Sequence, residues 1–173
     1  MQAVVTATPM VNILLPQSAT SVGFANTTGG YGGDIYVVTT LADADPAPPG
    51  SLREAVSAEG KRLVIFAVSG WIDLVKPLRI NNPEITIDGS TAPNKGVGLR
   101  VAIGVKANPM VLVNTNDVVI RYIRLRPGSR GHEVNLTNYD DPGFYETDAI
   151  LLTGVDGGYV ENVWLDHIDA SSG

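Results

Sequence analysis

Residues 117–123 read DVVIRYI, and the same kind of phrase occurs as EITIDG at residues 84–89 and as ENVWLDHI at residues 161–168. Each phrase begins with a polar turn and runs into β-branched residues, which favour strands. The starts of the phrases, at residues 84, 117 and 161, are 33 and 44 residues apart, so the repeat is irregular. Because similar phrases recur and the β-rich segments come every ten to twenty residues, this pattern favours a solenoid of parallel coils over a β-sandwich.

Short β-rich segments account for most of the chain after residue 60, and turn markers separate them. One helix is predicted earlier, at residues 51–56 (SLREAV), where Ser51 can cap the first turn and Glu54 follows three residues later. The predicted fold class is therefore all-β with one short helix. We predict strands at residues 35–39, 62–68, 71–75, 78–80, 84–88, 99–105, 110–113, 117–126, 148–152 and 159–169.

The first 20 residues form an apolar stretch that contains Pro9 and Pro16 but neither Lys nor Arg. This stretch is too short for a membrane span and lacks the charged start of a signal peptide. We predict that residues 1–20 are an extended arm, a first edge strand or the remnant of a processed precursor. Residues 21–173 are then expected to form the β domain.

The composition, with 44% hydrophobic and 17% charged residues, is that of an ordered globular protein. The net charge of −6 argues against a nucleic-acid partner, because such a partner requires a basic surface. An acidic protein can still bind an acidic polymer through a local basic site or a bridging cation. The chain contains no cysteine, which excludes disulfides and thiolate metal sites.

Several phrases in this chain are distinctive when taken together. They are GFANTTGGYGG (23–33), GSLREAV (50–56), VSGWIDLVKPLRINNPEITI (68–87), TAPNKGVGLR (91–100), VVIRYIRLRPG (118–128), DAILL (148–152) and ENVWLDHIDASS (161–172). Together they resemble the N-terminal portion of the pectate lyase-like family. The resemblance covers the chain from about residue 23 to its end, although Tyr31 stands where the family usually has an arginine. It implies a right-handed parallel β-helix, the pectin lyase-like solenoid, with a short N-terminal capping helix.

The resemblance also implies calcium-assisted β-elimination of an acidic polysaccharide. In the family, an acidic-x-acidic step before the Asp-Ala-Ile strand supplies two calcium ligands, and here that step is Glu146-Thr147-Asp148. Residues i and i+2 of a strand share a face, so both carboxylates can point to one ion. Ile150 follows Asp148 by two residues, so on a straight strand both side chains would lie on the same face. If Asp148 faces outward and Ile150 faces inward, the chain must bend near Ala149. The alternative is that Glu146 and Asp148 are solvated loop residues.

The remaining parts of the family's site, a second pair of calcium carboxylates and the arginine base, are expected beyond residue 173. No residue is therefore assigned a catalytic role. Arg124 and Arg126 share a face and could bind an acidic sugar. The alternative is that they lie on the outer wall and pair with neighbouring Asp and Glu residues.

Three further features are polar but carry no assigned chemistry. Asp166 and His167 are adjacent, and a strand places adjacent side chains on opposite faces, so a structural role is expected for this pair. The long loop 127–147, which contains His132, Asp140 and Asp141, could overhang a binding groove. GGYGG at residues 29–33 follows no predicted strand, which argues against a phosphate-binding loop.

Three functions remain open from the sequence. The first is a polysaccharide lyase, or the N-terminal part of one. The second is a non-catalytic β-helix that binds carbohydrate, and the third is a structural module, for example in a phage tail or capsid. The first two predict an extracellular or secreted protein, and the third predicts a virion protein.

The last predicted strand, at residues 159–169, has no evident cover, because residues 170–173 are too few to form another coil. An uncovered strand invites pairing with another chain. We therefore expect another chain, or a second copy of this one, to cover the open coil. The arm of residues 1–20 could supply the cover by exchange between copies.

Overall fold

Parallel strands in three sheets make up the architecture in the computed structural model, which describes residues 26–105, 107–127 and 148–171. Sheet A contains β1 (Asp34–Val38), β2 (Arg62–Phe66), β5 (Ile85–Asp88), β8 (Asn116–Arg121) and β11 (Glu161–Asp166). Sheet B contains β3 (Gly70–Leu74), β6 (Val97–Val101), β9 (Ile123–Arg126) and β12 (Asp169–Ala170). Sheet C contains β4 (Leu78–Ile80), β7 (Met110–Val113) and β10 (Ile150–Thr153).

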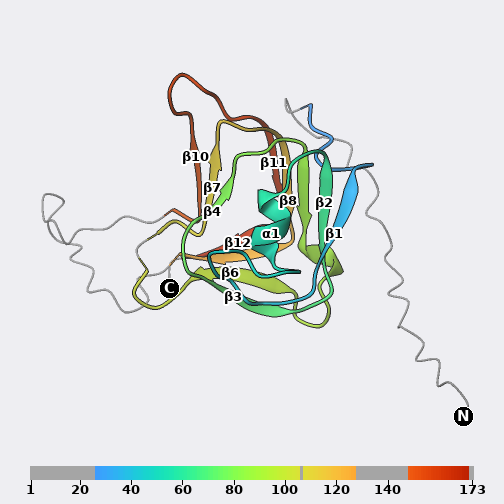
Figure 1. The fold of residues 1–173 in the computed structure, drawn as a ribbon, viewed down its shortest axis with the longest axis vertical. Coiled ribbons are helices and arrows are strands. Elements are labelled where there is room, and N and C mark those ends of the chain that lie inside the picture. The colour runs from blue at the N-terminus through green and yellow to red at the C-terminus, as the bar shows by residue number, and fades with distance from the viewer. Residues whose placement is uncertain (1–25, 106, 128–147, 172–173) are drawn as a thin grey trace, which may run out of the picture.

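From β2 onward the chain visits the sheets in the constant order A, B, C and then returns to sheet A one step further along. The coils are β2-β3-β4, β5-β6-β7 and β8-β9-β10, and β11-β12 begin a fourth. Each strand pairs in parallel with its counterpart in the next coil, and the sheets form the sides of the molecule in Figure 1. The chain is a right-handed parallel β-helix, so the predicted fold is confirmed.

Alternation along the strands places a column of aliphatic side chains inside the coils. Ile87 and Ile120 are in register in sheet A, and both are fully buried. Leu165 continues this column in β11 but remains 42% exposed, because no described coil covers it. Each buried member contributes about 1.5–3 kcal/mol of apolar burial to the folded state.

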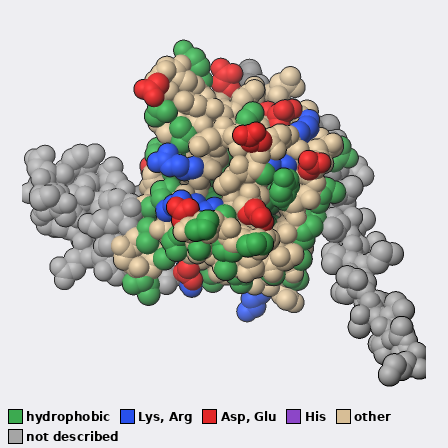
Figure 2. All heavy atoms as spheres, in the orientation of Figure 1, with side chains coloured by type: hydrophobic (Ala, Val, Ile, Leu, Met, Phe, Trp, Pro, Cys, Tyr) green, Lys and Arg blue, Asp and Glu red, His purple; other side chains and the backbone are tan. Residues whose placement is uncertain are grey.

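The helix α1 (Leu52–Ser57) closes the other end of the solenoid, where the three sheets surround it in Figure 1. The Ser51 hydroxyl accepts a hydrogen bond from the Glu54 amide at 3.2 Å, which confirms the predicted cap. The Glu54 carboxylate accepts from the Gly50 amide at 2.6 Å, one residue earlier than a capping box would predict. Leu52 and Val56 are buried in the core. Acidic and basic side chains are interspersed on this capped face (Figure 2).

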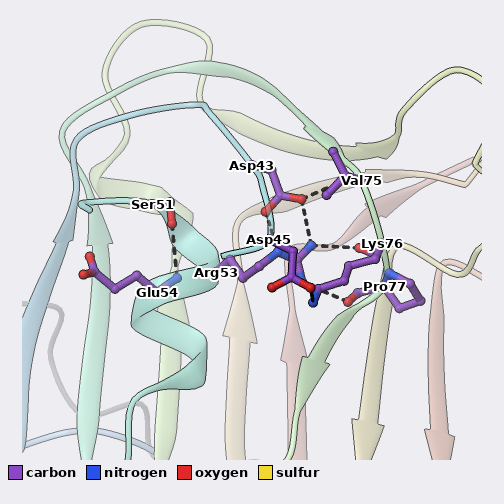
Figure 3. Close-up of polar contacts among 8 residues, drawn as sticks. All are labelled: Asp43, Asp45, Ser51, Arg53, Glu54, Val75, Lys76 and Pro77. Atoms are coloured by element: carbon purple, nitrogen blue, oxygen red, sulfur yellow. Dashed lines mark hydrogen bonds and ion pairs between the residues drawn. The ribbon is translucent and has the colours of Figure 1, made fainter. Parts of the chain in front are cut away.

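A buried ion pair fixes α1 to the connector that precedes it, residues 42–50. Arg53 bonds Asp43 at 2.6 and 2.7 Å, and its guanidinium also donates to the carbonyls of Lys76 at 2.8 Å and Pro77 at 3.1 Å (Figure 3). Asp43 in turn accepts from the Val75 amide at 2.9 Å. These contacts join α1, the connector and the corner between β3 and β4, so the cap cannot shift independently of the first coil.

The glycine-rich loop after residue 26 packs against sheet A. The Asp117 carboxylate accepts hydrogen bonds from the amides of Thr28 and Gly29, both at 2.7 Å, and from the hydroxyls of Thr27 and Thr28. A Cβ at Gly30 would lie 1.6 Å from the Arg62 carbonyl oxygen, so this position requires glycine. These two loop amides therefore serve the fold, and neither is directed at a ligand.

Three sequence predictions about strands are corrected. Residues 159–169 are not one strand, because they divide into β11 in sheet A and β12 in sheet B. Residues 117–126 are not one strand, because Tyr122 adopts a left-handed conformation (φ 55°) and separates β8 in sheet A from β9 in sheet B. The register of the third phrase also differs by one residue from the spacing of the phrase starts: Val118 pairs with Val163, an offset of 45 residues and not 44.

No helix in the described part of the chain has the length and apolarity needed to span a membrane.

Candidate functional site

Asp148 lies at the corner between sheets B and C, directly before β10. Its side chain is exposed, and its backbone amide donates to the Asn108 side-chain oxygen at 2.9 Å, which ties this corner to the equivalent corner of the preceding coil. The chain bends at Ala149, and Ile150 then packs against the core. The bend required by the strand parity is therefore present, so Asp148 can face outward while Ile150 faces inward.

The second predicted calcium ligand, Glu146, lies outside the described residues, as do His132, Asp140 and Asp141. Calcium takes six to eight oxygen ligands. Within the residues that the structure describes, no group of three or more His, Asp or Glu side chains is placed to hold a metal ion. Asp148 alone does not satisfy calcium, so the described residues do not by themselves fit the ion.

Arg126 is engaged by its neighbour in the next coil. Its guanidinium bonds the Asp169 carboxylate at 2.9 Å and donates to the carbonyls of Leu125 and Asp169, both at 2.9 Å. The hydrogen bond from Arg126 lowers the pKa of the Asp169 carboxyl below its ordinary value. Arg126 thus has the contacts expected for a residue of the outer wall.

Arg124 has a different environment, because it lies over an aromatic ring. Its guanidinium is 5.1 Å from the centre of the Trp71 ring, and it forms no hydrogen bond or ion pair with any described residue. The Trp71 ring lies across Gly98, where a Cβ would come within 2.4 Å of it. Arg100 and Arg126 approach the same ring at 5.6 and 5.7 Å. The ring orients Arg124 and leaves its donors available.

Comparisons with known proteins show which proteins this chain is similar to. The chain is 45% identical over 107 residues to "Probable pectate lyase C" of Emericella nidulans, a match that covers 62% of this chain and 23% of that protein. It is 33% identical over 156 residues to "Pectate lyase 3" of Ambrosia artemisiifolia, covering 86% of this chain and 36% of that protein. The chain is pectate lyase-like.

The fold of this pectate lyase-like chain also has a counterpart among solved structures. The crystal structure of Jun a 1, the major allergen from cedar pollen, matches with a TM-score of 0.54 and 24% identity, covering 85% of this chain and 43% of that one. The chain thus spans about a quarter of the first of these relatives and less than half of the others. No family model matches it.

The Asp166-His167 pair of the pectate lyase-like chain corrects one prediction. The two side chains meet, with His167 Nδ1 2.6 Å from Asp166 Oδ1, although adjacent strand residues were expected to point apart. The strand ends at Asp166, and His167 adopts a left-handed conformation (φ 49°) that turns its ring to the same side. The His167 ring then stacks on Tyr122 with centroids 4.4 Å apart.

Sequence reasoning missed the surroundings of this stack. Tyr122 and Lys95 border the same surface depression as Arg124, yet the sequence interpretation assigned a role to neither. One signal for Tyr122 was present, because Tyr122 and His167 are equivalent positions of the repeated phrases. Using that signal would have required the correct coil register.

Proposed function

We propose that this chain forms N-terminal coils of a polysaccharide lyase that cleaves pectate-like acidic polysaccharide by β-elimination. The observation that carries the proposal is the 45% identity to a probable pectate lyase over 107 residues. The parallel β-helix and the outward placement of Asp148 at a coil corner are consistent with it.

In β-elimination a base removes the proton on the carbon α to the uronate carboxylate, and the bond between the β carbon and the glycosidic oxygen breaks. The products are an unsaturated uronate and a sugar whose freed oxygen takes up a proton. The step requires stabilisation of the charge that develops on the carboxylate. Calcium is the cation proposed for that role, with Glu146 and Asp148 as two of its ligands. No described residue is proposed as the base.

Relatives named as pectate lyases also support a proposal on location. We infer that the protein acts outside the cell, where polymeric uronates are found. None of the relatives named above supports the alternative of a virion component. A non-catalytic carbohydrate-binding β-helix remains the second candidate, and the free donors of Arg124 favour a sugar-binding role of either kind.

The lyase proposal is tested with a chimera in which this chain replaces the matching segment of the Emericella nidulans relative. With polygalacturonate, we expect a calcium-dependent rise in near-ultraviolet absorbance from unsaturated products. Asp148→Ala and Glu146→Ala should each lower the rate at limiting calcium, by roughly tenfold or more. Asp156→Asn, at an exposed turn whose positive φ asparagine tolerates, is the control. A folded chimera whose rate is insensitive to both carboxylates would contradict the proposal.

The isolated chain is expected to be a poor enzyme and a poor calcium binder. Two carboxylates are too few for tight binding, so calorimetric titration should show at most weak affinity for calcium. No unsaturated product should accumulate from polygalacturonate. Submicromolar calcium affinity, or steady cleavage that disappears in Asp148→Ala, would show that the chain holds ligands and a base that have not been assigned.

A further inference from the structure

A groove of about 370 Å³ lies at the corner where the coils pass from sheet A to sheet B. This volume is within the range of small-molecule binding sites. The groove is distinct from the Asp148 corner, because β9 begins at the groove after Tyr122 and runs toward the opposite corner, between sheets B and C. Its polar and aromatic lining includes Ser90, Asn94, Lys95, Tyr122, Arg124 and His167.

Two cations in this groove form no ion pair with any described residue. Neither the Lys95 ammonium nor the Arg124 guanidinium forms an ion pair or hydrogen bond with a described residue. Asp169 also borders the groove and attracts Arg124 electrostatically, but its carboxylate is bonded to Arg126, which offsets its charge. Asp166, the other nearby acid, is bonded to His167. The groove therefore presents two cations whose donors form no bond, on a chain whose net charge is −6.

An aromatic platform lies beside these charges. The rings of Tyr122 and His167 are stacked with an interplanar angle of 16°, and both side chains are exposed. The left-handed backbone at each of these residues (φ 55° and 49°) turns both rings outward at the same corner of successive coils. Such a conformation is uncommon for residues other than glycine, and it is found here at two stacked positions.

We propose that this groove is an accessory binding site for a uronate-bearing segment of an acidic polysaccharide. Arg124 bonds a sugar carboxylate through its planar fork of donors, and Lys95 adds a second charge. The apolar face of a sugar ring packs on the Tyr122–His167 platform, while Asn94 and Ser90 supply hydrogen bonds to hydroxyls. The site holds the polymer on the solenoid without calcium. The choice of a uronate rests on the proposed function.

The test is calorimetric titration of a galacturonate oligomer into the 173-residue chain in EDTA, which removes any calcium-dependent binding. We expect measurable binding that weakens as salt rises and that is lost for the fully methyl-esterified oligomer. Lys95→Gln and Arg124→Gln should each weaken binding about tenfold. Arg100→Gln is the matched control: Arg100 lies on the same Trp71 ring but is paired with Asp73 outside the groove, so its loss should change affinity less than about twofold.

Lys95 is exposed and unbonded, so Lys95→Gln cannot act by unfolding the protein, and thermal unfolding midpoints check the other variants. Bound oligomer should also shift the ring proton signals of Tyr122 and His167. Absence of binding in EDTA, equal binding of the esterified oligomer, or unchanged affinity in both groove variants would overturn the proposal. Cleavage by the chimera is measured separately, so either proposal can fail without the other.

Discussion

Asp117 holds the glycine-rich loop through four hydrogen bonds, two from amides and two from hydroxyls. Burial raises the pKa of its carboxyl, but the hydrogen bonds from Thr27, Gly29 and Thr28 outweigh burial, so the net pKa is lower than the ordinary value. We expect Asp117→Asn to lower the free energy of unfolding by about 1–3 kcal/mol at pH 7. Asp156→Asn is the control, since both residues have positive φ, which Asn tolerates, and Asp156 lies at an exposed turn.

The same pair of variants gives a pH dependence with a defined sign. A carboxyl whose pKa is lower in the folded state contributes its full stability above the pKa of the unfolded chain, 3.8. That contribution disappears as the pH falls through the lower, folded-state pKa. Urea unfolding should therefore show a constant deficit for Asp117→Asn at neutral pH that shrinks below about pH 4. A deficit that grows on acidification would contradict this account.

Arg62 is a fully buried arginine. Among the described residues, its guanidinium donates hydrogen bonds only to carbonyl groups. Burial lowers the pKa of its guanidinium, and the five carbonyls compensate the charge. Its acceptors are Ala55 and Val56 at the end of α1, Gly60, Asn82 and Pro83. Its position at the C-terminal end of the helix is also favourable for a cation.

We expect Arg62→Met to lower the free energy of unfolding by about 3 kcal/mol or more, because several buried carbonyls lose their donor. The free energy of unfolding of Arg62→Lys should lie between that of the unchanged protein and that of Arg62→Met, because an ammonium offers three donors and no planar fork. Arg79→Met, at an exposed position of β4, should change stability by less than about 0.5 kcal/mol. Chemical denaturation measures all three. Equal losses at positions 62 and 79 would show that the carbonyl cluster does not need the charge.

At the scale of the element, β7 and β10 offer a matched comparison. Leu112 and Leu152 are register partners in the same interior column, yet Leu112 is 0% and Leu152 46% exposed. Leu112→Ala should cost about 2–5 kcal/mol, as in a packed core. Leu152→Ala should cost about 1 kcal/mol or less, because its site is half open. Thermal or urea unfolding decides, and similar costs would mean that Leu152 is covered in solution.

The elements also show what the sequence can and cannot predict. Runs of Val and Ile located the strands, and Ser51 with Glu54 located the helix, because these signals are local. The division at Tyr122 escaped prediction, since a tyrosine with positive φ carries no glycine or proline signal. The contact between Asp166 and His167 escaped prediction for the same reason, because His167 also has a positive φ. The bend at Ala149 could be predicted from the alternation of side chains along a strand. The groove could not, because it depends on the coil register, and the aligned phrases placed that register one residue off.

At the scale of the whole molecule, the two ends of the solenoid are unlike. The helix α1 covers one end, whereas Leu152 and Leu165 expose interior positions at the other. Exposed strands with apolar inner faces pair with other chains unless a charge prevents it. We expect the isolated chain to self-associate, giving a light-scattering mass above 18.2 kDa, and Leu165→Lys to reduce that mass. Removal of residues 1–20 tests whether the arm takes part.

A stable monomer near 18.2 kDa, both with and without residues 1–20, would contradict the expectation that the open coil recruits another chain. Leu41→Lys is a suitable comparison, because Leu41 packs against the core near the capped end. A lysine there should lower stability without acting on the open coil. Unfolding midpoints therefore separate loss of association from loss of folding.

The bonds from Asp117 to the glycine-rich loop join residues 88–90 positions apart, whereas strands of adjacent coils pair at about one coil's length. A stacked solenoid can grow from neighbour to neighbour, and Gly30 of this loop already bonds Thr86 of β5, but the bonds to Asp117 cannot form until β8 is in place. The docking of Thr28 and Gly29 onto Asp117 is therefore a late event in folding, although the loop lies early in the chain. In hydrogen exchange, the Thr28 and Gly29 amides should become labile whenever the third coil opens, and so report on an element far from them in the sequence.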